Sequence, residues 1–353
     1  MYISKLSAEN LRNLEAVGIE PCDSLNYLWG DNGAGKTSVL ESIFVLSRGR
    51  SFRTTQPSEL AGTGGKSFRV YAETVEDVGK THRIGLERSG THWRGRIDGE
   101  DVKKLSSLTR QLPLVLMEPD SHLLVNGPPE SRRKYLDWGM FHVEHGFLDT
   151  WRRFSKALKQ RNAALRQNNA RLLDSLDEVL AEYGSRLDVL RKRHAGMVAE
   201  KVGAIMERVS ETVPDVELEY QQGWKAETYL ESLKDRRKKD LERGITGSGP
   251  HRAELKLSCN GVPARAVLSR GEQKAFAAAM LLTQANLLVD GGQKPVLLLD
   301  DLISEFDTEH FNRVLRCSLD TACQIWVTGT EKPELDPLHR VFHVEQGRVR
   351  ELV

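Results

Sequence analysis

Cysteine is scarce in this sequence of 353 residues, with four in all, at positions 22, 259, 317 and 323. They form no C-x-x-C pair, and no histidines stand at zinc-binding spacing from them, which excludes a zinc module and a disulfide framework. Long hydrophobic runs are missing too, as is a basic and then apolar leader. We therefore expect a cytoplasmic protein of a reducing compartment, with no membrane partner.

Net charge and aromatic side chains are also low. Lys and Arg number 51 against 50 Asp and Glu, a formal net charge of +1, although 29% of the residues are charged. A protein that binds nucleic acid through bulk charge is strongly basic, so any polyanion must meet a local patch here. Because aromatic residues make up only 7% of the chain, a base-stacking platform is not expected, and contact with a duplex backbone is favoured.

The most informative segment is residues 30–37, which matches the phosphate-loop pattern G-x-x-x-x-G-K-[ST]. A strand-like segment precedes it and an amphipathic helical pattern follows, which argues against a chance glycine turn. Lys36 is expected to reach the β and γ phosphates, and the Thr37 hydroxyl to coordinate Mg²⁺. The residues expected to hold a nucleoside triphosphate here are Gly30, Asp31, Asn32, Gly33, Ala34, Gly35, Lys36, Thr37 and Ser38.

An apolar run at residues 296–299 ends in two acids, Asp300 and Asp301. Such a run is typical of a fully buried parallel strand, and ligands bind at the carboxyl ends of these strands. In phosphate-loop ATPases an aspartate at this place holds Mg²⁺, and a following acid orients the attacking water. We assign these catalytic roles to Asp300 and Asp301. The alternative is a strand that ends in a solvated acidic turn.

Residues 268–273 read Leu-Ser-Arg-Gly-Glu-Gln and open a helix shortly before the acidic strand. Ser269, with Glu272 three residues later, matches a capping box, so an ordinary helix start is one interpretation. The segment also resembles the signature motif of the ABC ATPases. That resemblance implies that Ser269 and Gly271 contact the γ-phosphate held by a partner subunit. Residues 304–307 resemble the D-loop of the same superfamily.

The order of the expected elements predicts an α/β fold in which two halves of the chain combine. Short strands are expected over residues 2–97, and strands alternate with helices after residue 254, including a strand at 262–267. Helices at about 147–167 and 187–209 lie between them. We expect a head lobe of residues 1–119 and 246–353, with a mixed sheet and helices, and an inserted α-helical arm lobe of residues 120–245.

The first arm helix has two expected faces. Its apolar face is expected to be buried and contains Trp151, Phe154, Leu158 and Leu165. Its basic residues are candidates for contact with DNA phosphates, and they are Arg152, Lys156, Lys159 and Arg161. The alternative for each of these basic residues is an ordinary solvated helix face.

The phosphate loop lies near one end of the chain and the signature and acids near the other, with a helical insertion between. This arrangement resembles the split head of the SMC-type ATPases, with a short arm. Within that group the chain resembles the RecF family of bacterial recombination mediators over nearly its whole length. Besides the segments above, the resemblance rests on residues 11–13, 49–53, 132–137, 159–165 and 249–252.

The resemblance implies a weak, DNA-dependent ATPase that uses ATP and Mg²⁺ and dimerises head to head on ATP. It places Arg12 and Asn13 near the nucleotide and Ser269 across the dimer. It implies binding to duplex DNA and single-strand gap junctions, and a RecR-like mediator, in support of RecA loading, replication restart and SOS induction. Asp301 is one methylene shorter than the glutamate usual at its position, so slow hydrolysis is expected.

Two other function classes use the same phosphate loop. An ATPase subunit of another ABC-type assembly, such as a transporter, normally carries its loop and signature much closer together in sequence. A P-loop small-molecule kinase would leave residues 268–272 as a plain helix cap. Dimerisation that depends on ATP and on Ser269 would distinguish the first interpretation from the kinase.

Overall fold

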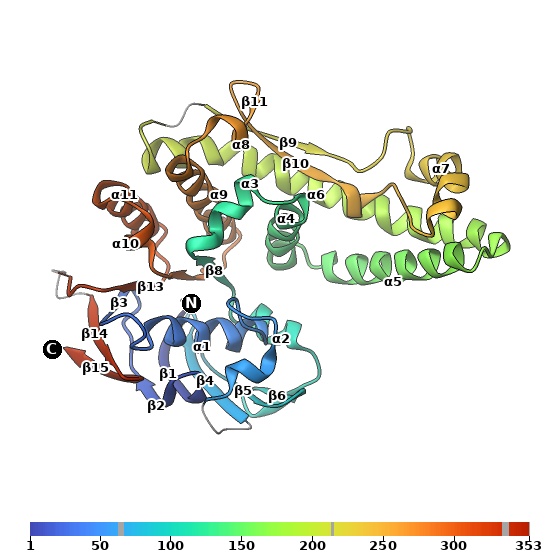
Figure 1. The fold of residues 1–353 in the computed structure, drawn as a ribbon. Coiled ribbons are helices and arrows are strands. Elements are labelled where there is room, and N and C mark those ends of the chain that lie inside the picture. Colours follow the sequence, from blue (N-terminus) through green and yellow to red (C-terminus); the bar gives the residue numbers. More distant parts are fainter. Residues whose placement is uncertain (63–66, 213–214, 334–338, 353) are drawn as a thin grey trace. The chain divides into compact units, whose positions relative to one another are not determined.

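The structure is a computed structural model and describes residues 1–62, 67–212, 215–333 and 339–352 (Figure 1). The chain divides into two compact units. The head unit contains Met1–Ser121, Arg208–Ser210 and Leu281–Val353, and the arm unit contains His122–Glu207 and Glu211–Met280. Both halves of the sequence therefore contribute to the head unit.

A largely parallel sheet forms one layer of the head unit. Its six strands, in order, are β15 (Arg348–Leu352), β14 (Arg340–Glu345), β3 (Leu25–Trp29), β13 (Ile325–Gly329), β12 (Val296–Leu299) and β8 (Leu114–Met117). Neighbouring strands run parallel except in the β14–β15 hairpin. Because parallel strands end at the same edge, the loops that follow β3, β8, β12 and β13 meet there.

A second sheet of the head unit is antiparallel throughout. Its strands, in order, are β2 (Leu14–Ile19), β1 (Tyr2–Leu11), β4 (Ser67–Val75), β5 (Thr81–Ser89), β6 (His92–Ile97) and β7 (Glu100–Val102). Helix α1 (Lys36–Arg48) contacts strands of both sheets. The remaining head helices are α2 (Leu105–Gln111), α10 (Leu302–Glu305) and α11 (Thr308–Leu319).

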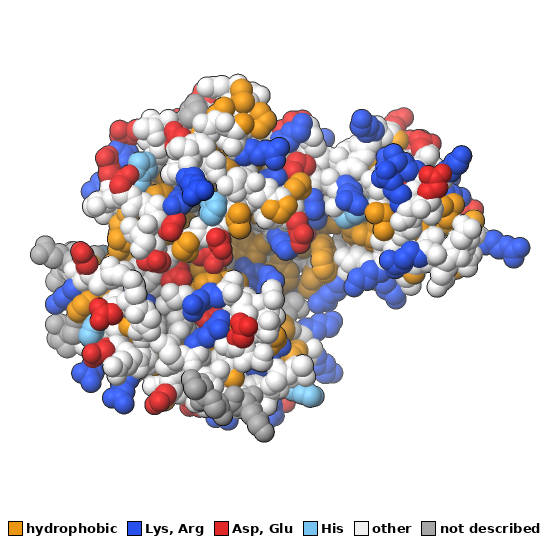
Figure 2. Space-filling model, viewed as in Figure 1, with side chains coloured by type: hydrophobic (Ala, Val, Ile, Leu, Met, Phe, Trp, Pro, Cys, Tyr) orange, Lys and Arg blue, Asp and Glu red, His pale blue; other side chains and the backbone are white. Residues whose placement is uncertain are grey.

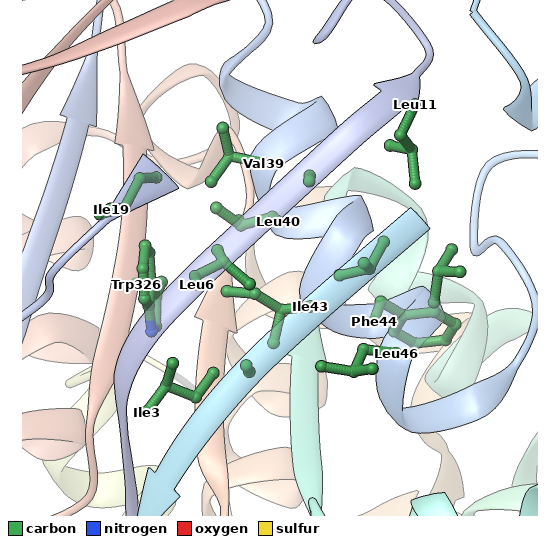
Figure 3. Close-up of a cluster of buried hydrophobic side chains, with 14 of the residues drawn as sticks. Ile3, Leu6, Leu11, Ile19, Val39, Leu40, Ile43, Phe44, Leu46 and Trp326 are labelled. Carbon is green, nitrogen blue, oxygen red and sulfur yellow. The ribbon is translucent and has the colours of Figure 1, made fainter. Parts of the chain in front are cut away.

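The hydrophobic core of the head unit surrounds α1. Val39 and Ile43 of this helix are fully buried and belong to one hydrophobic cluster with Leu6 of β1 and Trp326 of β13 (Figure 3). Leu46 is buried too, but so are Glu41, Ser42 and Ser47, so α1 is buried on nearly every side and is not the amphipathic helix that the sequence pattern predicted. The core therefore fixes the helix whose N-terminus carries the phosphate loop.

The arm unit is mainly helical and contains a three-stranded antiparallel sheet of order β11-β10-β9. Its elements are α3 (Leu123–Asn126), α4 (Pro129–Val143), α5 (Phe147–Arg166), α6 (Leu173–Val209), β9 (Val216–Gln221), α7 (Tyr229–Arg243), β10 (Glu254–Cys259), β11 (Val262–Pro263), α8 (Ala264–Val267) and α9 (Arg270–Asp290). Helix α6 ends, and α9 continues, in the head unit. In the described part of the chain, no helix has the length and hydropathy needed to cross a bilayer.

The second expected lobe boundary differs from the division in the structure. The first change of unit, after Ser121, falls close to the expected 119, but residues 246–280 belong to the arm unit and not to the head. The reason is that β10 pairs with β9 and the Tyr229 hydroxyl donates to the carbonyl of Ser248. The alternating sequence of β9 was missed, and the strand expected at 262–267 is a two-residue strand followed by α8.

The first arm helix also differs from expectation on its apolar face. Phe154 and Leu165 are buried, but Trp151 keeps 40% of its surface exposed. The second arm helix, α6, begins at Leu173 and not near residue 187. The periodic spacing predicted that both helices exist. It did not predict that Trp151 would stay exposed on the apolar face of α5.

Candidate functional site

The phosphate loop has the backbone shape that its glycines allow. Gly30, Gly33 and Gly35 adopt φ angles of 151°, 80° and 117°, which residues with a Cβ rarely adopt. A Cβ on Gly30 would lie 2.1 Å from the carbonyl oxygen of Val344. The loop leads directly into α1, and no described side chain caps the first amides of that helix. These amides are therefore available to an anion.

Lys36 lies across the inside of this loop. Its Nζ donates to the carbonyl oxygens of Gly30 at 2.6 Å and Asp31 at 2.9 Å. Burial lowers the pKa of Lys36, and the charges of Asp301, Asp300 and Asp31 oppose that shift. Within the described residues, the hydrogen-bond partners of this buried ammonium are backbone carbonyls. Such a group fits a polyphosphate, because phosphate oxygens would supply further counter-charge.

Thr37 and Asp300 meet as expected, although they lie 263 residues apart in the sequence. The Thr37 hydroxyl donates to Asp300 Oδ1 at 2.9 Å, and the Thr328 hydroxyl donates to the same oxygen at 2.9 Å. Burial raises the pKa of Asp300, and the two hydroxyl groups oppose that rise. A hydroxyl and a carboxylate at the end of a buried strand are oxygen ligands of the kind Mg²⁺ prefers.

Asp301 is held in a specific conformation beside Asp300. Its φ of 52° is left-handed, an uncommon region for a residue other than glycine. Its amide donates to the Thr328 hydroxyl at 2.8 Å, and its Oδ1 accepts a hydrogen bond from the Ser304 hydroxyl at 2.7 Å. The Thr328 hydroxyl therefore connects both acids.

The two residues expected near the nucleotide differ in their contacts. The Asn13 amide donates to the Gly33 carbonyl at 3.1 Å, and its oxygen accepts from the Ser38 hydroxyl at 2.8 Å, so Asn13 contacts the loop itself. Arg12 instead forms a two-bond ion pair with Glu41 of α1, at 2.9 Å for each bond. This carboxylate raises the pKa of Arg12.

Three charged residues of the site were missed from the sequence. Glu41 is fully buried and accepts hydrogen bonds from Arg12 and Ser51. The positive charge of Arg53 opposes the rise of the Asp300 pKa that burial causes. Glu118 follows β8, the strand beside β12, and burial together with Asp120 and Asp300 raises its pKa to about 7. An acid after a buried strand is the same signal that found Asp300, so Glu118 was detectable.

The β14–β15 hairpin contacts the phosphate loop through Val344 and Gly347. The amide of Gly347 donates to the carbonyl of Ala34 at 2.8 Å. Gly347 has a φ of 77°, and a Cβ there would lie 2.0 Å from the carbonyl oxygen of Asn13. Glycine is therefore required at both contacts of the hairpin with the loop region, at Gly30 and at Gly347.

Ser269 directly precedes α9 in the arm unit and forms the capping box that the sequence allowed. The Glu272 amide donates to the Ser269 hydroxyl at 3.3 Å, and the Ser269 amide donates to the Glu272 carboxylate at 2.7 Å. Ser269, Arg270 and Gly271 are all exposed. The helix-cap interpretation is therefore confirmed. Because the segment is exposed, it is also accessible to a partner subunit, as the signature interpretation requires.

The basic residues expected to contact DNA do not all lie on the surface. Arg152, Lys156 and Lys159 of α5 are exposed, and Lys and Arg side chains gather on the arm where α5 and α7 run (Figure 2). Arg161 is fully buried and pairs with Asp177 at 2.6 Å and with Asp240 at 2.8 Å. The expectation that Arg161 contacts DNA is therefore wrong, because its guanidinium is a core ion-pairing group.

Two of the other resemblance segments join elements inside the arm unit. In residues 132–137, Arg132 forms a two-bond ion pair with Glu254, and Asp137 does the same with Arg191. In residues 249–252, Gly249 faces the ring of Tyr229, and a Cβ there would lie 2.0 Å from the Tyr229 hydroxyl. These segments therefore connect helices of the arm with β10 and with the chain before it.

The chain is similar in sequence to known proteins over nearly its whole length. A family model described as "RecF/RecN/SMC N terminal domain" matches residues 2–350. The chain is 40% identical over 361 residues to the "DNA replication and repair protein RecF" of Xanthomonas axonopodis pv. citri (strain 306), covering 99% of this chain and 98% of that protein. The chain belongs to the RecF family. The RecF protein of Stenotrophomonas maltophilia (strain R551-3) is 41% identical, with 99% of both chains covered.

Solved structures show the same family fold. A structure described as "the recombination mediator protein RecF-ATPrS in RecFOR pathway" has a TM-score of 0.88 and 28% identity, and covers 100% of this chain and 98% of that chain. A structure described as "the SmcHead bound to the C-winged helix domain of ScpA" has a TM-score of 0.61 and 13% identity, and covers 100% of this chain and 97% of that one. The expected ATPase head fold of the RecF and SMC type is therefore confirmed.

Proposed function

We propose that this protein binds DNA in recombination repair as a dimer held together by ATP, and releases the DNA after slow hydrolysis. The observation that carries the proposal is the head site, where Lys36 lies across the phosphate loop and Thr37 is 2.9 Å from Asp300. Family membership supports it, because a similar solved structure is described as RecF-ATP in the RecFOR pathway. In such a dimer, residues 268–272 would contact the nucleotide of the other subunit. In a kinase they would serve only as a helix cap.

The residues of the head site fit ATP and Mg²⁺. The loop amides, Asn13 and the ammonium of Lys36 would hold the phosphates, and Thr37 with Asp300 would hold Mg²⁺. Bound Mg²⁺ would neutralise charge on the phosphates. Asp301, held beside Asp300 by Ser304 and Thr328, would orient the attacking water. Its short side chain reaches less far than a glutamate, so we propose a weak ATPase that DNA stimulates.

The signature segment is the proposed contact between subunits. Ser269 is exposed, and two exposed apolar side chains precede it, Val262 at 44% and Val267 at 49% exposure. Exposed apolar side chains that gather around one segment mark interaction surfaces. We propose that this segment of one subunit covers the γ-phosphate held by the other.

Ser269→Arg is expected to keep the protein monomeric at saturating ATP, because a long side chain would occupy the place of the phosphate contact. Light scattering with and without a non-hydrolysable ATP analogue measures the change. Glu272→Ala is the matched control, since it removes half of the capping box but keeps Ser269. If wild type stays monomeric with the analogue, the proposed dimer is rejected.

DNA contact is proposed for the exposed basic side of α5. The helix carries six Lys and Arg residues (Arg152, Arg153, Lys156, Lys159, Arg161 and Arg166) against one acid (Asp149). Arg161 is buried, and Arg153 pairs with Asp149 at 2.8 Å. The other four, Arg152, Lys156, Lys159 and Arg166, are exposed and form a patch of positive charge. A chain with a formal net charge of only +1 needs such a local patch to bind a polyanion.

Reversing the charge of Arg152, Lys156 and Lys159 to Glu is expected to weaken DNA binding and reduce its salt dependence. Three lost phosphate contacts should make the slope of log K against log salt shallower by about three. Fluorescence anisotropy across a salt series measures this slope. Lys103→Glu with Lys104→Glu, on the exposed head surface, is the control. An unchanged slope would show that these residues do not contact DNA and form an ordinary solvated face of α5.

The biological role is proposed from the family. The protein would act at duplex–single-strand gap junctions in the cytoplasm, with a RecR-like mediator, to support RecA loading, replication restart and SOS induction. The name "DNA replication and repair protein RecF" of its relatives supports this place in repair. An ATPase subunit of another ABC-type assembly remains the alternative if ATP-driven dimers form but do not bind DNA.

A further inference from the structure

Trp151 is an exposed tryptophan beside the basic side of α5. It keeps 40% of its surface exposed, whereas Phe154 and Leu165 of the same helix are buried. Leaving an indole of this size in water costs free energy, since burying an aromatic side chain is among the largest hydrophobic gains available to a protein. The exposed part of the indole is therefore available to a partner, and covering it would be favourable.

The residues one helical turn from Trp151 are uncharged, including Leu148 and Ser155, and the basic residues of α5 lie beyond them. At about 100° and about 1.5 Å per residue, Arg152 lies about 100° around the axis from Trp151, and Lys159 lies about 80° around the axis and about 12 Å along it. Among the described residues, Lys156 and Lys159 have no ion-pair partner, and Asp149, the one acid of α5, is bound to Arg153. The surroundings of the indole thus favour a partner that combines negative charge with flat apolar surface.

We propose that Trp151 stacks on an unpaired base where duplex DNA opens into a single strand, while the basic residues of α5 hold the adjoining duplex phosphates. This inference rests on the proposed DNA-binding function and adds to it the residue that selects the junction. In an intact duplex each base is stacked on both faces, so the indole gains nothing there. At a junction a base face is free, and stacking on an aromatic side chain is sequence-tolerant.

The test compares gapped and blunt duplex DNA of equal length, bound by the full chain with a non-hydrolysable ATP analogue. Trp151→Ala is expected to weaken binding to gapped DNA about tenfold, because stacking contributes about 1–3 kcal/mol per base. Binding to the blunt duplex should change less than about twofold, since the phosphate contacts remain. Trp151→Phe should retain most of the preference. Val189→Ala, at a 65% exposed apolar position on α6, is the control.

A second measurement uses the wild-type chain, so it does not depend on a variant. A 2-aminopurine placed as the first unpaired base should lose fluorescence on binding, and one placed inside the duplex should not. Equal weakening of gapped and blunt DNA by Trp151→Ala, or unchanged 2-aminopurine emission, overturns the inference. If α5 charge reversal still removes DNA binding in that case, the proposed function stands without it; if wild type binds no DNA, both fall.

Discussion

Lys36→Ala is expected to lose ATP binding while the fold persists. The ammonium donates to two loop carbonyls in the structure, at 2.6 and 2.9 Å, and it is the group that would meet the phosphates. Hydrogen bonds to charged groups contribute about 1.5–3 kcal/mol each, so losing two or more should weaken ATP at least about a hundredfold. Isothermal titration with ATP and Mg²⁺ measures the loss.

Lys159→Ala is the matched control for this experiment, because it removes an exposed lysine from the arm and should leave ATP affinity unchanged. Circular dichroism and the melting temperature of the nucleotide-free protein establish whether Lys36→Ala still folds. Retained ATP affinity in a folded Lys36→Ala protein would contradict the assignment of the phosphate loop.

Arg161→Met is expected to destabilise the arm unit strongly. Arg161 is fully buried, and its removal leaves the buried carboxylates of Asp177 and Asp240 without their common partner. Breaking a buried ion pair by removing one partner typically costs about 3–5 kcal/mol. Asp177 keeps Arg237 and Asp240 keeps the Gly247 amide, which limits the loss to this range. Chemical denaturation followed by circular dichroism measures the change in unfolding free energy.

Lys159→Met tests whether the effect belongs to the buried network or to the helix in general. Its side chain is exposed on the same helix, so a change within about 0.5 kcal/mol is expected. The triple variant Arg161→Met, Asp177→Leu, Asp240→Leu should recover much of the lost stability, because apolar residues can replace a buried charged group. Equal stability of Arg161→Met and wild type would show that the network contributes nothing net.

The nucleotide site could be predicted from the sequence because its chemistry depends on short local patterns. Glycines at 30, 33 and 35 and the apolar run before Asp300 each specify their own backbone. Parallel pairing then brings the ends of β3 and β12 to one edge through β13, which lies between them. Thr37 and Asp300 meet for that reason, even though the sequence separates them widely.

Burial of long polar side chains could not be predicted in the same way. Arg152 and Arg161 belong to the same helix and the same residue type, yet one is exposed and the other is fully buried. The difference arises from Asp177 and Asp240, which lie on α6 and α7 and are recognisable as partners only after the arm has folded. Trp151 and Phe154 differ for a similar reason, because helical spacing states which residues share a face but not how far the neighbouring elements cover it.

Support of the phosphate loop by the β14–β15 hairpin has a consequence for protein synthesis. Strand β3, which leads into the loop, lies between β13 and β14 in its sheet, and the amide of Gly347 donates to the carbonyl of Ala34. A ribosome makes the loop long before it makes β13 and β14. While the chain is still being translated, the loop lacks the partners that shape it, so a nascent chain should be unable to retain ATP until residue 347 has left the exit tunnel.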